Sequence, residues 1–208
     1  MGGEQTLFPL LNLVRLRMDT DGAGVTTLVA GKGCPLSCKY CLNRRILAQK
    51  TPEWVTPKQL AERAAIDNLY FQATGGGLCF GGGEALLHAR FIAETAALVG
   101  GAWRITVETS LNVPSELLEQ TLGAVDAYIV DVKTMDPQIY KAYTGGSMEN
   151  VLLNLKRLAA VVPPQSVLLR VPLIPGFNDE TDRARSVAKL KELGFTRFDL
   201  FTYKTEVE

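Results

Sequence analysis

The sequence predicts an α/β protein with a parallel sheet, arranged as a partial (β/α)6 TIM-like barrel. Short β-like runs alternate with helical patterns along the chain, and this alternation is typical of βα units with parallel strands. Polar residues follow several of the expected strands directly. Functional groups of such folds gather at the carboxyl ends of the strands, so these polar residues fit the same architecture.

Six runs of apolar and β-branched residues mark the expected strands, and helical patterns separate them. Proline at a first turn and glycine beyond a last turn set several helix ends. The expected strands cover residues 25–30, 78–81, 104–109, 127–133, 167–173 and 197–203. The expected helices cover residues 57–71, 90–99, 114–122 and 149–160, and a last helix begins at Asn178 or Asp179 and ends before Gly194.

The whole chain, residues 1–208, is expected to form one domain, because its length suffices for a single core and no linker is visible. Residues 1–24 form a lead-in and residues 25–204 the barrel. The formal charge is zero, from 22 basic and 22 acidic residues, which argues against a nucleic-acid partner. No apolar run is long enough to span a membrane, and residues 7–14 lack the features of a signal peptide.

Three of the four cysteines lie within eight residues, at Cys34, Cys38 and Cys41. Clustered cysteines without a secretion signal indicate metal binding in a reducing cytoplasm. A structural zinc site normally has four protein ligands, but the remaining candidates, Cys79 and His88, are isolated. Three thiolates in one loop suit an iron–sulfur cluster that leaves one iron open. Buried packing cysteines and a degenerate zinc knuckle are the alternatives.

Polar residues at or after the strand ends are the second group of candidates. Side chains alternate along a strand, so Ile129, Asp131 and Lys133 are expected to point to one side. Charges there would be costly in an apolar interior but would bind a polar ligand in a barrel lumen; a surface-exposed pair is the alternative. The other candidates are Gly82, Gly83, Glu84, Glu108, Thr109 and Arg170.

The cysteine spacing C-x3-C-x2-C, with Tyr40 before the last cysteine, resembles the signature of the radical S-adenosylmethionine (SAM) superfamily. The glycine-rich segment that ends in Glu84 agrees with it. The resemblance runs from about residue 19 to about residue 204 and points to the glycyl-radical-enzyme activases, of which pyruvate formate-lyase activating enzyme is the best known. The segments that resemble this branch are residues 21–34, 41–43, 82–85, 131–133 and 170–179.

The resemblance implies that the clustered cysteines bind a [4Fe–4S] cluster and that SAM binds its open iron. Tyr40 would pack on the adenine, and the glycine amides with the Glu84 carboxylate would hold the amino end of the methionine. A tight strand-to-helix turn is the alternative for that segment. Arg170 would hold a carboxylate or reach a substrate protein, or form a structural ion pair. The residues expected at the cofactors are Tyr40, Gly82, Gly83, Glu84, Glu108, Thr109, Asp131, Lys133 and Arg170.

The resemblance also implies a small site for a monovalent cation, made by Asp131 with Glu108 and Thr109. The sequence departs from the activase pattern at two positions. Glu108 stands where the activases commonly have aspartate. Lys204 follows Tyr203 where they often have histidine.

The activity implied is anaerobic, reductive cleavage of SAM to a 5′-deoxyadenosyl radical, which removes a hydrogen atom from a glycine of a partner glycyl radical enzyme. A flavodoxin or a ferredoxin-type protein would supply the electron. The cofactor supplies this chemistry and the barrel orients it. A radical SAM enzyme that acts on a small molecule or peptide is one alternative, and a non-catalytic metal-binding module is the other.

Overall fold

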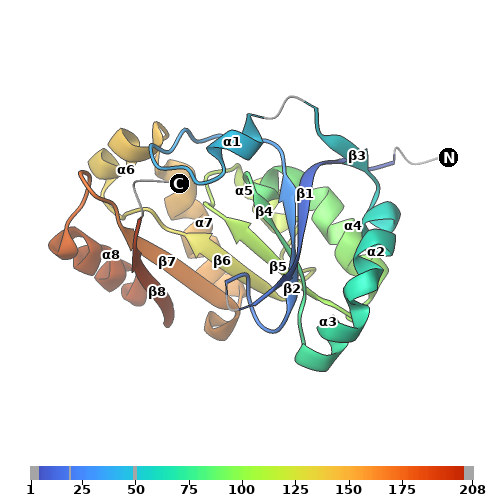
Figure 1. The fold of residues 1–208 in the computed structure, drawn as a ribbon. Coiled ribbons are helices and arrows are strands. Elements are labelled where there is room, and N and C mark those ends of the chain that lie inside the picture. The colour runs from blue at the N-terminus through green and yellow to red at the C-terminus, as the bar shows by residue number, and fades with distance from the viewer. Residues whose placement is uncertain (1–4, 19, 49–50, 204–208) are drawn as a thin grey trace.

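A single curved sheet of eight strands forms the centre of the computed structural model, which describes residues 5–18, 20–48 and 51–203, and helices lie along the outer face of the sheet (Figure 1). The strand order is β3-β1-β2-β4-β5-β6-β7-β8. The strands are β1 (Phe8–Arg17), β2 (Thr26–Gly31), β3 (Glu53–Val55), β4 (Gly77–Gly82), β5 (Arg104–Thr109), β6 (Ala127–Asp131), β7 (Val167–Leu173) and β8 (Arg197–Thr202). The strands β2 and β4 to β8 pair in parallel, which confirms the predicted parallel α/β sheet.

Helices connect the parallel strands, and their ends follow the sequence signals. Asp179 caps α8 through a capping box with Asp182, and Gly100 ends α4 in the left-handed conformation. The helices are α1 (Arg44–Leu47), α2 (Pro57–Ala64), α3 (Asn68–Thr74), α4 (Ala89–Val99), α5 (Ser115–Glu119), α6 (Pro137–Thr144), α7 (Glu149–Val161) and α8 (Glu180–Glu192), with short 3-10 turns η1 (Ala65–Asp67), η2 (Ala85–His88) and η3 (Pro164–Ser166). Within the described residues, no helix has the length and hydropathy that a bilayer crossing requires.

Several elements differ from the sequence prediction. Part of the expected lead-in is the strand β1, which pairs antiparallel with β2 and β3. The helix expected over residues 57–71 is interrupted by η1, because the buried carboxylate of Asp67 turns inward to accept hydrogen bonds from Arg15 and Thr27. The helix expected over residues 114–122 ends at Glu119, and α6 was not predicted.

Alternation along the parallel strands separates an apolar outer layer from a polar inner face. Val107 and Val130 lie in the hydrophobic core beneath the helices. Their neighbours Glu108 and Asp131 point the other way and line a cavity on the concave side. Since all six parallel strands end at one edge, their polar carboxyl-terminal residues meet there. The predicted strand 127–133 ends two residues early, at Asp131, yet Lys133 still lines the same cavity.

One buried amide fixes the loop that follows β5 at this edge. Leu111 in this loop has a positive φ of 58°, which is uncommon for a non-glycine residue. The Asn154 side chain from α7 donates to the carbonyls of Leu111 and Val113, at 2.9 and 2.8 Å, and accepts from the Ser115 hydroxyl at 2.8 Å. These three bonds therefore hold the loop in a conformation that its own residues would not favour.

We expect Asn154→Ala to lower the free energy of unfolding by about 2–4 kcal/mol, because two buried carbonyls lose their partners. Urea unfolding followed by far-UV circular dichroism measures this change. Asn150→Ala, an exposed asparagine on the same helix, is the matched control and should change it by less than about 0.5 kcal/mol. Equal stability of the two variants would contradict the role given to Asn154.

Candidate active site

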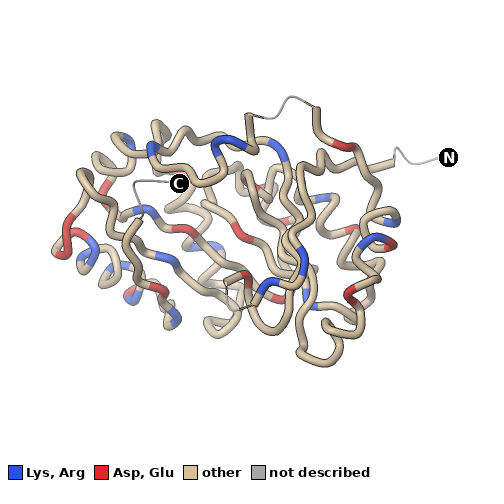
Figure 2. The backbone as a smooth tube through the Cα atoms, in the orientation of Figure 1, with Lys and Arg blue, Asp and Glu red and all other residues tan. Residues whose placement is uncertain are grey.

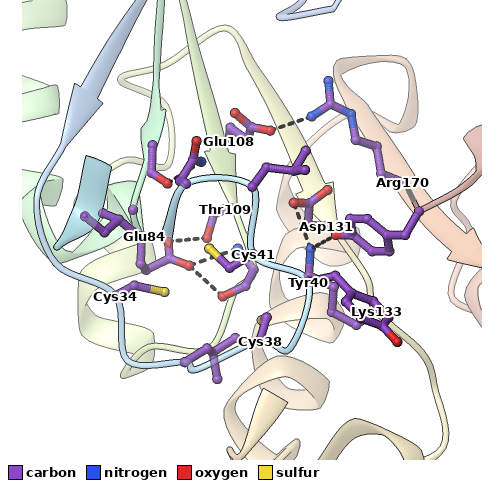
Figure 3. Close-up of a pocket in the computed structure, with 18 of the residues that line it drawn as sticks. Cys34, Cys38, Tyr40, Cys41, Glu84, Glu108, Thr109, Asp131, Lys133 and Arg170 are labelled. Carbon is purple, nitrogen blue, oxygen red and sulfur yellow. Dashed lines mark hydrogen bonds and ion pairs between the residues drawn. The ribbon is translucent and has the colours of Figure 1, made fainter. Parts of the chain in front are cut away.

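All twelve site residues predicted from the sequence line one cavity of about 340 Å³ at the carboxyl edge of the sheet (Figure 3). The cysteine loop after β2 forms one wall, and the ends of β4, β5, β6 and β7 form the others. The alternative of a surface-exposed pair is therefore wrong for Lys133, which is 6% exposed, and its neighbour Asp131 is half-buried. The lining residues from the prediction are Cys34, Cys38, Tyr40, Cys41, Gly82, Gly83, Glu84, Glu108, Thr109, Asp131, Lys133 and Arg170.

Backbone hydrogen bonds attach the cysteine loop to the carboxyl end of α6. The amide of Ser37 donates to the Thr144 carbonyl at 2.9 Å, and the amide of Lys39 donates to the Tyr143 carbonyl at 3.1 Å. The last carbonyls of a helix have no partner within the helix, so α6 offers these acceptors. On the other side, Arg44 donates to the Cys38 carbonyl at 2.9 Å. The middle of the loop that carries the three cysteines is thus held by α6 and by the Arg44 side chain.

The three cysteines line the cavity, and the pKa values of two of them, Cys34 and Cys38, are raised. Cys34 is exposed as a residue, yet burial around its thiol raises its pKa to about 11. Burial also raises the pKa of Cys38, although the Lys133 ammonium acts in the opposite direction. Among the described residues, no three His, Cys, Asp or Glu side chains converge closely enough to hold a single metal ion. Three soft donors around one cavity suit a thiolate-bound cluster.

The segment Gly82–Glu84 supports the cysteine loop, which differs from the role expected for its amides. The Gly83 amide donates to the Gly31 carbonyl at 3.1 Å, and the Glu84 amide donates to the Gly33 carbonyl at 2.8 Å. A Cβ atom on Gly83 would lie 2.0 Å from the Gly33 carbonyl oxygen, so only glycine permits this approach. These two amides are therefore already bonded within the protein and are not open to a methionine.

The Glu84 carboxylate is buried and fully engaged within the protein. It accepts hydrogen bonds from the Thr109 hydroxyl at 2.5 Å, the Ser110 hydroxyl at 2.6 Å and the Ser110 amide at 2.9 Å. It also accepts from the Leu86 amide at 3.1 Å and so caps η2. Glu84 therefore ties the end of β4 to the end of β5, whereas the sequence prediction had it bind the methionine amino group.

Lys133 is held as a cation beside Cys38. Its ammonium group donates to Asp131 at 3.0 Å and to the Tyr203 hydroxyl at 2.7 Å (Figure 3). Burial alone would lower the pKa of Lys133, but the Asp131 carboxylate and the Tyr203 hydroxyl together raise it well above its usual value. The predicted pair Asp131 and Lys133 thus forms a direct ion pair. Lys204, the second departure noted in the sequence, lies outside the described residues.

The three residues of the predicted cation site contact other side chains of the protein. The Glu108 carboxylate lies 2.5 Å from the Arg170 guanidinium, Asp131 pairs with Lys133, and the Thr109 hydroxyl donates to Glu84. Burial and the nearby Asp131 raise the pKa of Glu108 to about 7, against the opposing effect of Arg170. Glu108 and Asp131 each have a cationic side chain as partner, and a monovalent cation held by these residues stays a prediction.

Arg170 links distant parts of the chain beneath the cavity. Besides Glu108, its guanidinium donates to the Thr20 carbonyl in the turn between β1 and β2, and it lies 3.7 Å from Asp199 on β8. Four segments therefore meet at this side chain. The structural ion pair that the sequence left open as an alternative is present, although Arg170 also lines the cavity.

Aromatic rings close the side of the cavity next to the cysteine loop. The Tyr40 hydroxyl donates to the Pro175 carbonyl at 3.1 Å, and its ring lies 6.0 Å from Tyr143 and 5.9 Å from Phe177. The sequence analysis missed Tyr143, Ser110, Asp199 and Phe201 as lining residues. Strand alternation could have found Asp199 and Phe201, because they stand two apart on β8 just as Asp131 and Lys133 do on and after β6.

Comparison with known protein families decides the identity of this fold and site. Residues 28–188 match the Radical SAM superfamily. The chain belongs to the radical SAM superfamily. Its members use a [4Fe–4S] cluster and SAM, so the radical SAM cofactors foreseen from the cysteine motif are those of this chain.

Curated relatives of this radical SAM chain are activating enzymes. It is 36% identical over 140 residues to the (2S)-3-sulfopropanediol dehydratase activating enzyme of Klebsiella oxytoca, an alignment that covers 66% of this chain but only 44% of the relative. It is 26% identical over 247 residues to the (2S)-3-sulfopropanediol sulfolyase activating enzyme of Bilophila wadsworthia, covering 88% and 81%. It is 29% identical over 213 residues to the pyruvate formate-lyase-activating enzyme of Streptococcus mutans, covering 94% and 78%.

Solved structures share the radical SAM fold at low sequence identity. Streptococcus suis SuiB superposes with a TM-score of 0.66 at 15% identity, over 86% of this chain and 40% of SuiB. The Escherichia coli coproporphyrinogen III oxidase HemN superposes with a TM-score of 0.53 at 13% identity, over 96% of this chain and 51% of HemN. Both likenesses confirm the partial-barrel fold.

We expect Glu84→Gln to destabilise the cofactor-free radical SAM chain by about 2–4 kcal/mol, because an amide nitrogen would replace an acceptor that several donors share. Guanidinium unfolding of the cofactor-free protein measures this. Glu62→Gln, at an exposed position with only a 3.9 Å ion pair to Lys58, is the matched control and should be neutral. An unchanged midpoint combined with weaker SAM binding would instead make Glu84 a ligand-binding group.

Proposed function

We propose that this chain activates a glycyl radical enzyme. Cys34, Cys38 and Cys41 would hold a [4Fe–4S] cluster, with SAM in the adjoining cavity. The cluster with SAM would supply one-electron, reductive cleavage of SAM, and through it the removal of a hydrogen atom from a glycine of the partner. The single observation that carries the proposal is that three thiols from one loop and nine predicted cofactor residues line the same cavity.

The side chains of the cavity would orient charge and exclude water. Lys133 keeps its positive charge beside Cys38, where it favours a thiolate and a substrate carboxylate. The rings of Tyr40, Tyr143 and Tyr203 shield the cavity from solvent on the side of the cysteine loop. Exclusion of water protects reactive intermediates from side reactions.

Abstraction of a hydrogen atom needs no protein acid or base, and the one histidine of the sequence lies away from the cavity. His88 lies outside the cavity lining, with its Nε2 atom 2.8 Å from the Lys32 carbonyl. The names of the three curated relatives, all activating enzymes, support a partner enzyme as substrate. We further propose a flavodoxin or a ferredoxin-type protein as electron donor. The single-domain organisation and the cytoplasmic location stay predictions.

We expect each of the variants Cys34→Ala, Cys38→Ala and Cys41→Ala, reconstituted without oxygen, to lose the iron that the wild type binds, about four ions per chain. None should release 5′-deoxyadenosine from SAM with dithionite. Iron and sulfide analysis, electron paramagnetic resonance (EPR) spectra and chromatography measure the outcomes.

Cys79→Ala is the matched control for these variants. Cys79 is fully buried in β4 and does not line the cavity, so iron content and SAM cleavage should be retained. Zinc in place of iron in the wild-type protein, or a cluster whose spectrum ignores SAM, would contradict the proposal.

We expect a glycine-centred EPR signal when the reduced, SAM-loaded chain is mixed with its cognate glycyl radical enzyme. The signal should show a doublet that collapses when the partner carries α-deuterated glycine, because the doublet arises from the remaining α-hydrogen. Replacement of the radical glycine of the partner by alanine is the control. Release of 5′-deoxyadenosine without any signal on a panel of such partners would favour a small molecule or peptide as substrate.

A further inference from the structure

The segment around the cysteines has an unusual charge for a chain with no net charge. Residues 22–52 contain no aspartate or glutamate but five basic residues. Four of these lie in the part that the structure describes, at Lys32, Lys39, Arg44 and Arg45. We name residues 32–48 the basic loop. Figure 2 shows blue and no red along this loop, whereas both colours are mixed over the helices.

The basic loop also carries the three cysteines that are expected to bind the cluster. It contains Cys34, Cys38 and Cys41, of which Cys34 is exposed and the other two are half-buried. A second cavity, of about 410 Å³, touches all three cysteines, and the charged residues that line it, Lys32 and Arg44, are both basic. Access to the cysteines through this second cavity therefore crosses a surface of one sign of charge, whereas the first cavity is lined by residues of both signs.

We propose that the basic loop is the docking surface for a small electron-carrier protein with an acidic face around its redox centre. This rests on the proposed function, in which every SAM cleavage requires one electron from outside. One electron leaves the carrier, which is oxidised, and reduces the cluster, while no bond forms or breaks between the proteins. Complexes of this type bury little surface and depend on electrostatic steering, so exposed charges rather than an apolar patch are what such a surface needs.

Two of the basic residues are free to meet a partner. Lys39 and Arg45 are exposed, and neither side chain has an ion pair or hydrogen bond with another described residue. Arg44 differs, since it donates to the carbonyls of Cys38 and Lys39 and thereby stabilises the loop itself. Arg44 therefore has a structural role in the loop, whereas the side chains of Lys39 and Arg45 make no hydrogen bond or ion pair that would give them one.

The test compares SAM cleavage driven by reduced flavodoxin with cleavage driven by sodium dithionite, a small reductant that needs no docking surface. The variants are Lys39→Glu and Arg45→Glu. Lys156→Glu, at an exposed position on α7, is the matched control. Titration of each cluster-loaded variant with oxidised flavodoxin gives a Kd that does not depend on SAM chemistry.

We expect each loop variant to raise the KM and the Kd for flavodoxin about 5- to 10-fold, and to leave the dithionite-driven rate within about twofold of wild type. The flavodoxin-driven rate of the wild type should fall as salt rises, and this dependence should weaken in the variants. Lys156→Glu should match the wild type in every assay.

Three outcomes would overturn the docking surface. Unchanged flavodoxin constants in both loop variants, with normal dithionite-driven cleavage, would do so and leave the proposed function intact. A parallel loss with dithionite would mean that the substitutions damage the cluster loop rather than a docking surface. Wild-type protein that cleaves no SAM with either reductant would overturn the proposed function and the docking surface together.

Discussion

The carboxylate of Glu84 is the interaction on which the geometry of the site most depends. It stands two residues after the end of β4 and accepts hydrogen bonds from Thr109 and Ser110 at the end of β5, while its own backbone amide holds the start of the cysteine loop. A buried carboxylate is stable only when donors satisfy it, and here four do. Hydrogen bonds to the end of β5 fix Glu84, and the Glu84 amide in turn fixes the position of the cysteine loop relative to the sheet.

Unlike Glu84, three other carboxylates of the interior each have a cationic side chain as partner. Glu108 is matched by Arg170, Asp131 by Lys133, and Asp21 by Arg17, whose guanidinium donates to that carboxylate. Taking one partner of such a pair away would leave a buried charge uncompensated. This pairing explains how several ionisable side chains can line one partly buried cavity.

The sequence predicted what is local and missed what depends on distant partners. The cysteine spacing and the polar strand ends are local signals, and the twelve residues that they single out line one cavity. The partners of those residues were not, because Thr20 meets Arg170 across 150 positions of the chain. Likewise β1 was expected only as a lead-in, since its neighbours β2 and β3 decide that it is a strand. Tyr143 was missed because the helix that carries it, α6, was missed.

The raised pKa values of Cys34 and Cys38 have a consequence for the whole cluster site. Thiols must lose their protons to bind iron, and burial makes that loss costly at Cys34 and Cys38. The site must therefore compensate the negative charge that appears on metal binding. Lys133 does this from inside the cavity, where its ammonium group is buried beside Cys38. Reduction of the cluster would add a further negative charge at the same place, so this one buried cation favours both assembly and reduction. The exposed charges of the basic loop act only weakly on the thiols, because water and salt screen them.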